Sequence, residues 1–317
     1  MNTFKIIIKG NLDFGNQKSF EAMFAHFQKR LELYYKNDIA LKGLDFFDVD
    51  QMCLVVPRTE LMCSEKTWKN TFGLLRELRT FAVAGVLHVW VLDEKNQLLV
   101  GDAIEPQGDK VATTEYNRGC LFLKKGDEMA AIESFNKAID KYPRYAQAYE
   151  RRGVAHARLG QTEDALLDFS KSIGISPNSE AYFGRALTFK TMGKIAEALA
   201  EFDVAIKNAV PFQSIFWMAR RVKGETHLEQ KQLKEACFEL KLVSKRPFKE
   251  NDPNYPYRRQ AWEMYAAALE QSGNKNEAKL ALEQAKALGN LGNGLETAEI
   301  LRGATDAPKA VRQVAAV

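Results

Sequence analysis

A repeat of about 34 residues runs through the second part of this chain and restricts its fold more than any other feature. A glycine followed five residues later by an alanine marks four copies. This pair occurs as Gly126 and Ala131, Gly160 and Ala165, Gly193 and Ala198, and Gly273 and Ala278. The strand pattern ends at about residue 112. A unit of this length cannot bury an apolar face alone, so the spacing predicts stacked helical hairpins that form a solenoid.

Three copies carry small, aromatic and proline residues at matching offsets. The first has Gly119, Phe122, Gly126, Ala131, Phe135, Ala138 and Pro143. The second has Tyr149, Gly153, His156, Gly160, Ala165, Phe169, Ser172 and Pro177. The third has Tyr182, Ala186, Phe189, Gly193, Ala198, Phe202 and Ala205. At these offsets the chain resembles the tetratricopeptide repeat (TPR) family.

The resemblance covers residues 112–292 and implies an all-α, right-handed solenoid of about five hairpins. We expect these hairpins at 112–145, 146–178, 179–212, 217–248 and 259–292. The fourth copy is degenerate, because Gln230, Lys231 and Gln232 stand where the other copies have a glycine between the helices. The insertion that follows it, 249–259, is expected to be an irregular loop. Residues 293–317 are predicted to contain a capping helix, 295–301, and a mobile tail.

The repeated residue types have physical roles that need no ligand. Small residues such as Gly119 and Gly153 let two helices approach closely, and Phe135 fills the space between successive hairpins. Proline cannot continue a helix and therefore ends the second one. A basic residue also recurs just before the small residue of each copy, which favours a structural role with a packed aliphatic stem. These basic residues are Arg118, Arg152, Arg185 and Lys223.

Residues 1–105 have a different pattern, in which strand and helix signals alternate. Apolar and β-branched runs predict strands at 4–9, twice within 45–57, at 86–92 and at 97–101. Apolar residues at three- and four-residue spacing predict helices at 18–36, capped by Asn16 or Ser19, and at 64–81, capped by Ser64. The order β-α-β-β-α-β-β predicts a two-layer α+β domain with both helices on one sheet face. Residues 106–111 form the expected linker.

The sequence provides little support for a metal or cofactor site. The histidines lie in four different predicted elements, and Cys53 and Cys63 are ten residues apart, so neither set has the spacing of metal ligands. Asp45, Asp48 and Asp50 lack the glycine of a calcium loop and indicate a solvated turn. The loop 10–16 lacks the lysine of a phosphate-binding loop and contains an aspartate. We therefore predict no metal, no cofactor and no catalytic residue.

The strand and helix order of residues 1–105 resembles the RNA-recognition-motif fold. The predicted strand near 52–58 offers Cys53, Leu54, Val55 and Val56 where that family has aromatic side chains that stack on bases. Residues 1–105 carry 13 basic and 14 acidic side chains, which argues against binding to phosphates. Nucleic-acid binding is therefore disfavoured, although a catalytic, nucleotide-binding or RNA-binding N-terminal domain stays the alternative function.

The composition also bears on the cell compartment and on membranes. The longest apolar stretch, 81–92, is interrupted by Gly85 and His88 and is shorter than the roughly 20 residues needed to cross a bilayer. Four scattered cysteines are typical of reduced thiols rather than of a disulfide framework. We expect a cytoplasmic protein without a membrane association.

The resemblance implies a concave groove lined by the first helix of each hairpin. The residues that it places in this groove are Tyr116, Asn117, Lys124, Arg151, Arg158, Phe183, Lys190 and Arg221. All five charged residues of this set are basic, and residues 106–317 carry 32 basic against 27 acidic side chains. The sequence therefore predicts a non-enzymatic adaptor or scaffold that captures an acidic or C-terminal peptide segment.

Overall fold

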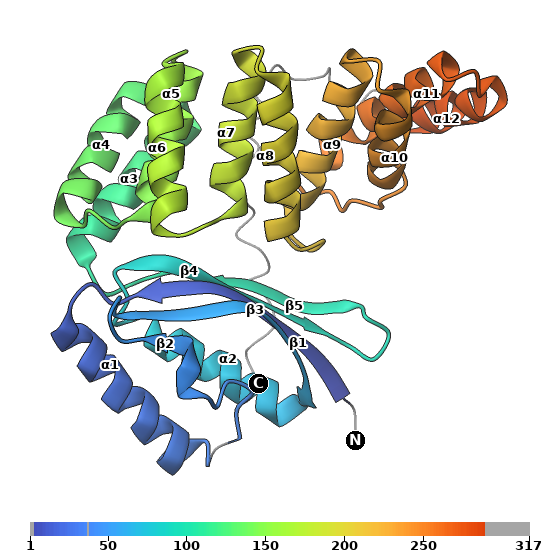
Figure 1. The fold of residues 1–317 in the computed structure, drawn as a ribbon. Coiled ribbons are helices and arrows are strands. Elements are labelled where there is room, and N and C mark those ends of the chain that lie inside the picture. Colours follow the sequence, from blue (N-terminus) through green and yellow to red (C-terminus); the bar gives the residue numbers. More distant parts are fainter. Residues whose placement is uncertain (1–2, 37, 289–317) are drawn as a thin grey trace. The chain divides into compact units, whose positions relative to one another are not determined.

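The computed structural model describes residues 3–36 and 38–288, which form an antiparallel sheet with two helices, followed by a series of paired helices (Figure 1). These residues divide into two compact units. One unit contains residues up to 122 together with 129–149, and the other contains 123–128 and the residues from 150 onward. The first unit therefore includes the α+β domain and most of the first helical hairpin.

The sheet has five strands in the order β2-β3-β1-β4-β5, and every neighbouring pair is antiparallel. Their bounds are β1 Thr3–Asp13, β2 Phe47–Asp48, β3 Cys53–Ser64, β4 Ala84–Leu92 and β5 Leu98–Ile104. The long central strand β1 pairs along its length with both β3 and β4. The predicted strand and helix order is confirmed, and the four strands β1 to β4 have the split β-α-β arrangement.

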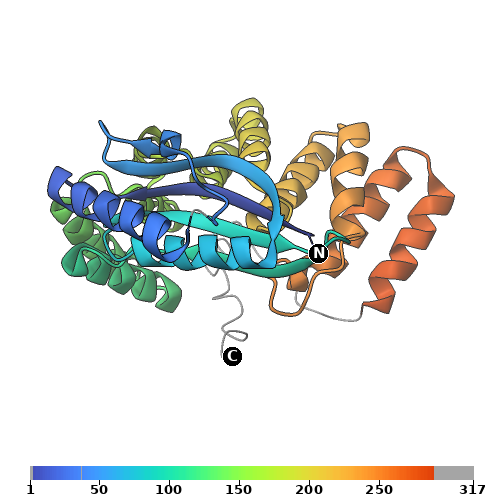
Figure 2. The ribbon, with the colours of Figure 1, turned by 90° about the horizontal axis from the view of Figure 1, so that it is seen from below.

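Two helices, α1 (Gln17–Lys29) and α2 (Glu65–Leu78), lie side by side on one face of the sheet (Figure 2). The side chain of Asn16 accepts a hydrogen bond from the Ser19 amide and caps α1, and Ser64 caps α2 in the same way. The core between the layers contains Ile6 and Leu12 of β1 and the aliphatic and aromatic side chains of the two helices. The two-layer prediction is therefore confirmed.

Several elements have bounds that differ from the predicted ones. The first strand continues to Asp13, so the expected loop at 10–16 is shortened to Phe14–Asn16. Gly10 lies inside this strand at a register shift, and a Cβ atom there would be only 2.0 Å from the Val86 carbonyl oxygen. The α-helical part of the first helix ends at Lys29 and continues as a π-helix, η1 (Arg30–Tyr34). A glycine after an apolar run predicts a turn. Gly10 stays within the strand instead, because the neighbouring strand leaves no room for a side chain.

Five helical hairpins follow among the described residues, as predicted. Their helices are α3 Lys110–Lys125, α4 Glu128–Lys141, α5 Ala146–Arg158, α6 Thr162–Ile175, α7 Ser179–Thr191, α8 Ile195–Asn208, α9 Ser214–Glu229, α10 Leu233–Ser244, α11 Arg258–Gln271 and α12 Lys275–Ala287. The insertion contains a short 3₁₀ helix, η3 (Tyr255–Tyr257). The expected capping helix at 295–301 lies outside the described residues.

A glycine on the first helix packs against a phenylalanine on the second helix in the first two hairpins, as the repeat pattern predicts. A Cβ atom on Gly119 of α3 would be 2.5 Å from the ring of Phe135 of α4, and one on Gly153 of α5 would be 3.1 Å from the ring of Phe169. Both rings are fully buried. The helices can therefore approach closely only because these positions have no side chain.

Candidate functional site

The predicted groove residues of the first hairpin keep part of their surface accessible. Asn117 and Lys124 are exposed on α3, and Tyr116 is half-buried. The Tyr116 ring stacks on that of Tyr145, with 5.0 Å between the ring centroids. Tyr116 and Lys124 are eight residues apart, so they lie on the same face of α3. This face combines an aromatic ring with an exposed ammonium group.

In the second hairpin, Arg151 lies next to a buried carboxyl group. Glu150 of α5 is 5% exposed, and its Oε2 atom is 3.2 Å from Nε of Arg151. Burial raises the pKa of Glu150 to about 7, the charge of Arg151 opposes this rise, and the charge of Glu180 adds to it. Glu150 is thus the carboxyl group on this helix whose charge changes near neutral pH.

Arg158, which was predicted to line the groove, instead forms contacts within the solenoid. Its Nη1 atom donates a hydrogen bond of 2.9 Å to the Leu123 carbonyl oxygen and lies 3.6 Å from a carboxylate oxygen of Glu128. Its side chain is only 3% exposed. These contacts tie the end of α5 to the turn between α3 and α4.

The remaining predicted residues are largely engaged or buried. Phe183 of α7 has no exposed surface and packs against Phe202, with ring centroids 5.8 Å apart. Lys190 donates a 3.0 Å hydrogen bond to Glu229 of α9. Arg221 of α9 is 1% exposed, and its guanidinium carbon lies 4.0 Å from the centroid of the Tyr257 ring. The structure thus divides the predicted set into exposed or half-buried residues on α3 and buried or paired residues on α5, α7 and α9.

The basic residues that recur just before the small residue of each hairpin form ion pairs within three hairpins. The partner is always an acidic residue 16 positions later on the second helix. The pairs are Arg152 with Asp168 at 2.6 Å, Arg185 with Glu201 at 2.7 Å, and Lys223 with Glu239 at 3.2 Å. Opposite charges at this spacing in successive copies were the signal that could have revealed the pairs from the sequence.

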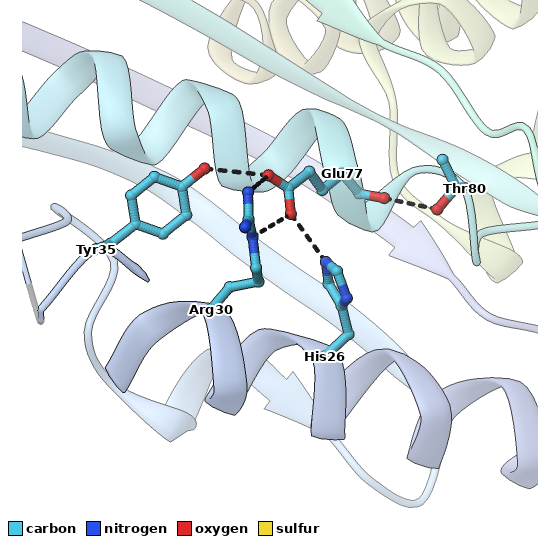
Figure 3. Close-up of polar contacts among 5 residues, drawn as sticks. All are labelled: His26, Arg30, Tyr35, Glu77 and Thr80. Carbon is cyan, nitrogen blue, oxygen red and sulfur yellow. Dashed lines mark hydrogen bonds and ion pairs between the residues drawn. The ribbon is translucent and has the colours of Figure 1, made fainter. Parts of the chain in front are cut away.

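The N-terminal domain contains a polar cluster between α1 and α2 that sequence reasoning missed (Figure 3). Its centre is Glu77 of α2, whose carboxylate accepts hydrogen bonds from Arg30 Nε at 2.7 Å and from the Tyr35 hydroxyl at 3.1 Å. His26 Nε2 lies 2.8 Å from the same carboxylate. Burial by itself would raise the pKa of Glu77, but the hydrogen bonds from Arg30 and His26 outweigh it, so this pKa lies below its ordinary value. The cluster fastens the two helices to each other.

A second polar cluster lies within the first compact unit, where β1 and β3 meet the turn between α4 and α5. The buried Asp13 accepts a 2.9 Å hydrogen bond from the Gly15 amide, and Arg144 Nη2 lies 3.4 Å from its other oxygen. Arg144 Nη2 is also 3.7 Å from the sulfur of Cys53. Burial, followed by the charge of Asp13, raises the pKa of Cys53 to about 12. Burial also raises the pKa of Tyr142, and a hydrogen bond with Asp13 adds to the rise.

In the part of the chain that the structure describes, no group of three histidine, cysteine or acidic side chains could hold a metal ion. The apolar slot between α2 and the sheet has a volume of about 10 Å³, which is room for about one water molecule. Each helix within 3–36 and 38–288 is too short or too polar to pass through a lipid bilayer.

Comparison with known proteins gives a family match within the helical hairpins and several similar proteins. The sequence model of the tetratricopeptide repeat matches residues 116–180. The human mitochondrial import receptor subunit TOM70 is 28% identical over 131 residues, which are 35% of this chain and 22% of that protein. Tetratricopeptide repeat protein 36 of Danio rerio is 29% identical over 120 residues, 36% of this chain and 64% of that protein.

Among solved structures, PilW, a type IV pilus biogenesis factor, is 18% identical, with a TM-score of 0.49. The match covers 62% of this chain and 88% of PilW. The chain spans less than two thirds of the length of the two curated relatives named above. The predicted repeat, the observed hairpins and the match to the family's sequence model all include residues 116–180. Residues 116–180 of this chain are therefore similar in sequence to the tetratricopeptide repeat family.

Proposed function

We propose that this protein is a non-enzymatic interaction adaptor that captures an acidic or C-terminal peptide segment along the first helices of its hairpins. The observation that carries the proposal is the accessible face of α3, where Tyr116, Asn117 and Lys124 combine an aromatic ring, an amide and a cation. An aromatic side chain supplies apolar contact area, and cations supply charge-assisted hydrogen bonds to carboxylates.

Charge supports an acidic partner. Residues 106–317 carry 32 basic against 27 acidic side chains. Lys124 is exposed and forms no ion pair with any residue within 3–36 and 38–288. Three acidic residues of the second helices are already neutralised by the ion pairs inside their hairpins. The remaining surface cations are therefore available to attract an anionic segment. We propose that this interaction takes place in the cytoplasm.

The test is capture of partners by the full-length protein, with cross-linking and mass spectrometry as the readout. Asn117→Glu combined with Lys124→Glu adds one negative charge and reverses a positive one at two exposed positions of α3, and we expect it to abolish capture because the acidic segment is then repelled. A matched control, Lys171→Glu with Lys207→Glu, reverses two exposed charges on the second helices α6 and α8. Equal recovery of partners by both double variants would overturn the proposal.

The alternative of a catalytic, nucleotide-binding or RNA-binding N-terminal domain is not favoured by the geometry. Asn16, in the loop considered for phosphate binding, caps α1. Glu77 and Asp13 are engaged by neighbouring side chains and backbone groups. Trp90, an aromatic residue on a central strand, is only 4% exposed and is not available for stacking on a base.

A further inference from the structure

The segment from the end of α10 to the start of α11, residues 241–259, is rich in cations. It contains six basic and two acidic residues, a surplus of four that equals the net charge of the whole chain. Lys241 is paired with Glu277, and Arg259 with Glu263. The other basic residues of the segment form no ion pair among the residues that the structure describes: Lys245, Arg246, Lys249 and Arg258. Most of the positive charge of this segment is therefore left to attract an anion.

Two of these arginines lie over aromatic rings at the surface. The guanidinium carbon of Arg246 is 5.2 Å from the centroid of the Trp217 ring, and that of Arg258 is 3.4 Å from the centroid of the Tyr255 ring. Arg246 is exposed, and the Nη atoms of the half-buried Arg258 are not closed off from solvent. Nε of Arg258 donates a 3.0 Å hydrogen bond to the Tyr255 carbonyl oxygen, which fixes the side chain. Each pair thus presents a flat cation to the outside.

The two arginine–aromatic pairs share one supporting apolar cluster. This cluster includes the buried Phe248, and both Trp217 and Tyr255 pack against it. The rings of Trp217 and Phe248 meet edge to face, with centroids 6.0 Å apart. The insertion is also fixed to α9, because Asn254 donates a 2.9 Å hydrogen bond to the Ser214 carbonyl oxygen. The two pairs therefore belong to one held surface, on which a ligand can bind without a large rearrangement.

We propose that this surface binds single-stranded nucleic acid. It is called the α10–α11 surface below and consists of Lys245, Arg246, Lys249, Arg258, Trp217 and Tyr255. A single strand presents a planar base and a phosphate in every unit, which match the flat arginines and the neighbouring lysines. An acidic peptide would use the cations but not the flat faces.

The α10–α11 surface is separate from the other parts of the chain to which a function was assigned. Residues 1–105 carry nearly equal numbers of basic and acidic side chains, but this surface lies outside them. It also uses none of the residues of α3 proposed for peptide capture. Either proposal can therefore fail without the other.

Four fluorescent probes of equal length test the class of ligand by anisotropy with the full-length protein. Dodecauridine RNA and dodecathymidine DNA offer bases and phosphates, a chain of twelve abasic deoxyribose phosphates offers phosphates alone, and dodecaglutamate offers carboxylates. We expect the RNA or the DNA to bind at least about tenfold more tightly than the abasic chain and the peptide, because stacked bases add to the affinity. Equal affinity for the abasic chain or for dodecaglutamate, or no binding of either nucleic acid, would overturn the proposal.

The salt dependence of binding measures how many phosphates the surface neutralises. Four cations on a single strand predict that the logarithm of the association constant falls with the logarithm of the salt concentration with a slope of about −3. Lys245→Gln combined with Lys249→Gln should make this slope shallower by about 1 to 1.5. The matched control, Lys171→Gln with Lys207→Gln, removes two exposed lysines of α6 and α8 and should leave the slope unchanged. Equal changes in the two double variants would indicate general charge attraction and would contradict the surface.

A conservative variant separates stacking from charge. Arg246→Lys keeps the positive charge and removes the flat guanidinium, so we expect the affinity for the nucleic acid that binds to fall by about threefold to tenfold, with that for the abasic chain unchanged. The matched control is Arg118→Lys, because Arg118 is also exposed and lies over an aromatic ring, 5.6 Å from the centroid of Phe122. Circular dichroism checks that both variants keep their helical content. Wild-type affinity of Arg246→Lys, or an equal loss in Arg118→Lys, would contradict the role of the arginine–aromatic pair.

Discussion

At the scale of single residues, the turn between the helices of each hairpin shows how a degenerate repeat keeps its fold. In four hairpins this turn contains a glycine with positive φ, between 74° and 86°: Gly126, Gly160, Gly193 and Gly273. In the fourth hairpin Lys231 takes the same place with φ of 57°. The left-handed conformation is therefore required by the turn, and Lys231 adopts it despite its side chain.

Replacement of Lys231 by glycine should stabilise the protein. The left-handed conformation costs a residue with a Cβ roughly 1–2 kcal/mol, and glycine loses part of this gain through the greater freedom of its unfolded chain. We expect Lys231→Gly to raise the free energy of unfolding by about 0.5–1 kcal/mol in urea denaturation. Gly160→Ala, at the equivalent turn with no atom within 4 Å of an added Cβ, should lower it. Changes with the opposite signs would contradict this account.

At the scale of elements, charged side chains join pairs of helices. In the α+β domain Glu77 joins α2 to α1, and in the solenoid the ion pairs between positions 16 apart join the two helices of a hairpin. The first hairpin lacks such a pair, because Ser134 stands 16 residues after Arg118. Helix pairing in this chain thus depends on apolar packing first and on charge in selected hairpins.

The pKa of Glu77 predicts a pH dependence of stability. Because its folded pKa lies below the ordinary value, its contribution to stability is present above the unfolded pKa, about 4.3, and is lost as the pH falls through the folded value. The wild-type protein should therefore lose stability below about pH 4.5 more steeply than Glu77→Gln. Thermal unfolding of both proteins between pH 3 and 7 measures the difference, and parallel curves would contradict it.

Asp168 tests the ion pairs within the hairpins. Its side chain is 4% exposed, and Arg152 donates two hydrogen bonds to it. Asp168→Ser copies the residue found in the first hairpin and removes the buried carboxylate that accepts two hydrogen bonds from Arg152, so we expect a loss of about 2 kcal/mol in the free energy of unfolding. Adding Arg152→Met should recover part of this loss in a double-mutant cycle. Additive effects of the two substitutions would show that the pair is not coupled.

At the scale of the molecule, the first hairpin contacts the α+β domain within one compact unit. Asp13 at the end of β1 and Cys53 at the start of β3 both lie next to Arg144, and Gln147 of α5 accepts a hydrogen bond from the Gly85 amide. The linker predicted at 106–111 therefore does not separate the two parts physically. Folding of the first hairpin should depend on the domain before it.

Substitution of Asp13 should destabilise the local structure of both the α+β domain and the first hairpin. Asp13→Ala removes the acceptor for the Gly15 amide and the anionic neighbour of Arg144. We expect faster hydrogen exchange at residues 142–147 and in β1, with exchange in α11 and α12 unchanged. Cys53 should also react faster with a thiol reagent at pH 8, because its high pKa depends partly on the charge of Asp13 and on burial. Faster exchange throughout the chain would indicate global destabilisation instead.

The sequence by itself determined the repeat, the five hairpins and the strand and helix order of the first 105 residues. These features depend on contacts between residues close in the chain, such as Gly119 with Phe135, so local spacing reports them. It also placed Tyr116, Asn117 and Lys124 on α3, where they are accessible.

Only the tertiary structure decided which of the other groove residues are buried and which polar groups meet. Phe183 and Arg221 have the composition expected of a binding face, but burial depends on neighbouring helices and on the insertion, which no local pattern encodes. Glu77 meets His26, and Asp13 meets Arg144, across long stretches of chain. Such contacts follow from the packing of whole helices and strands. The position of the backbone in the fold decides which groups a charged side chain contacts, and the neighbouring residues in the sequence do not.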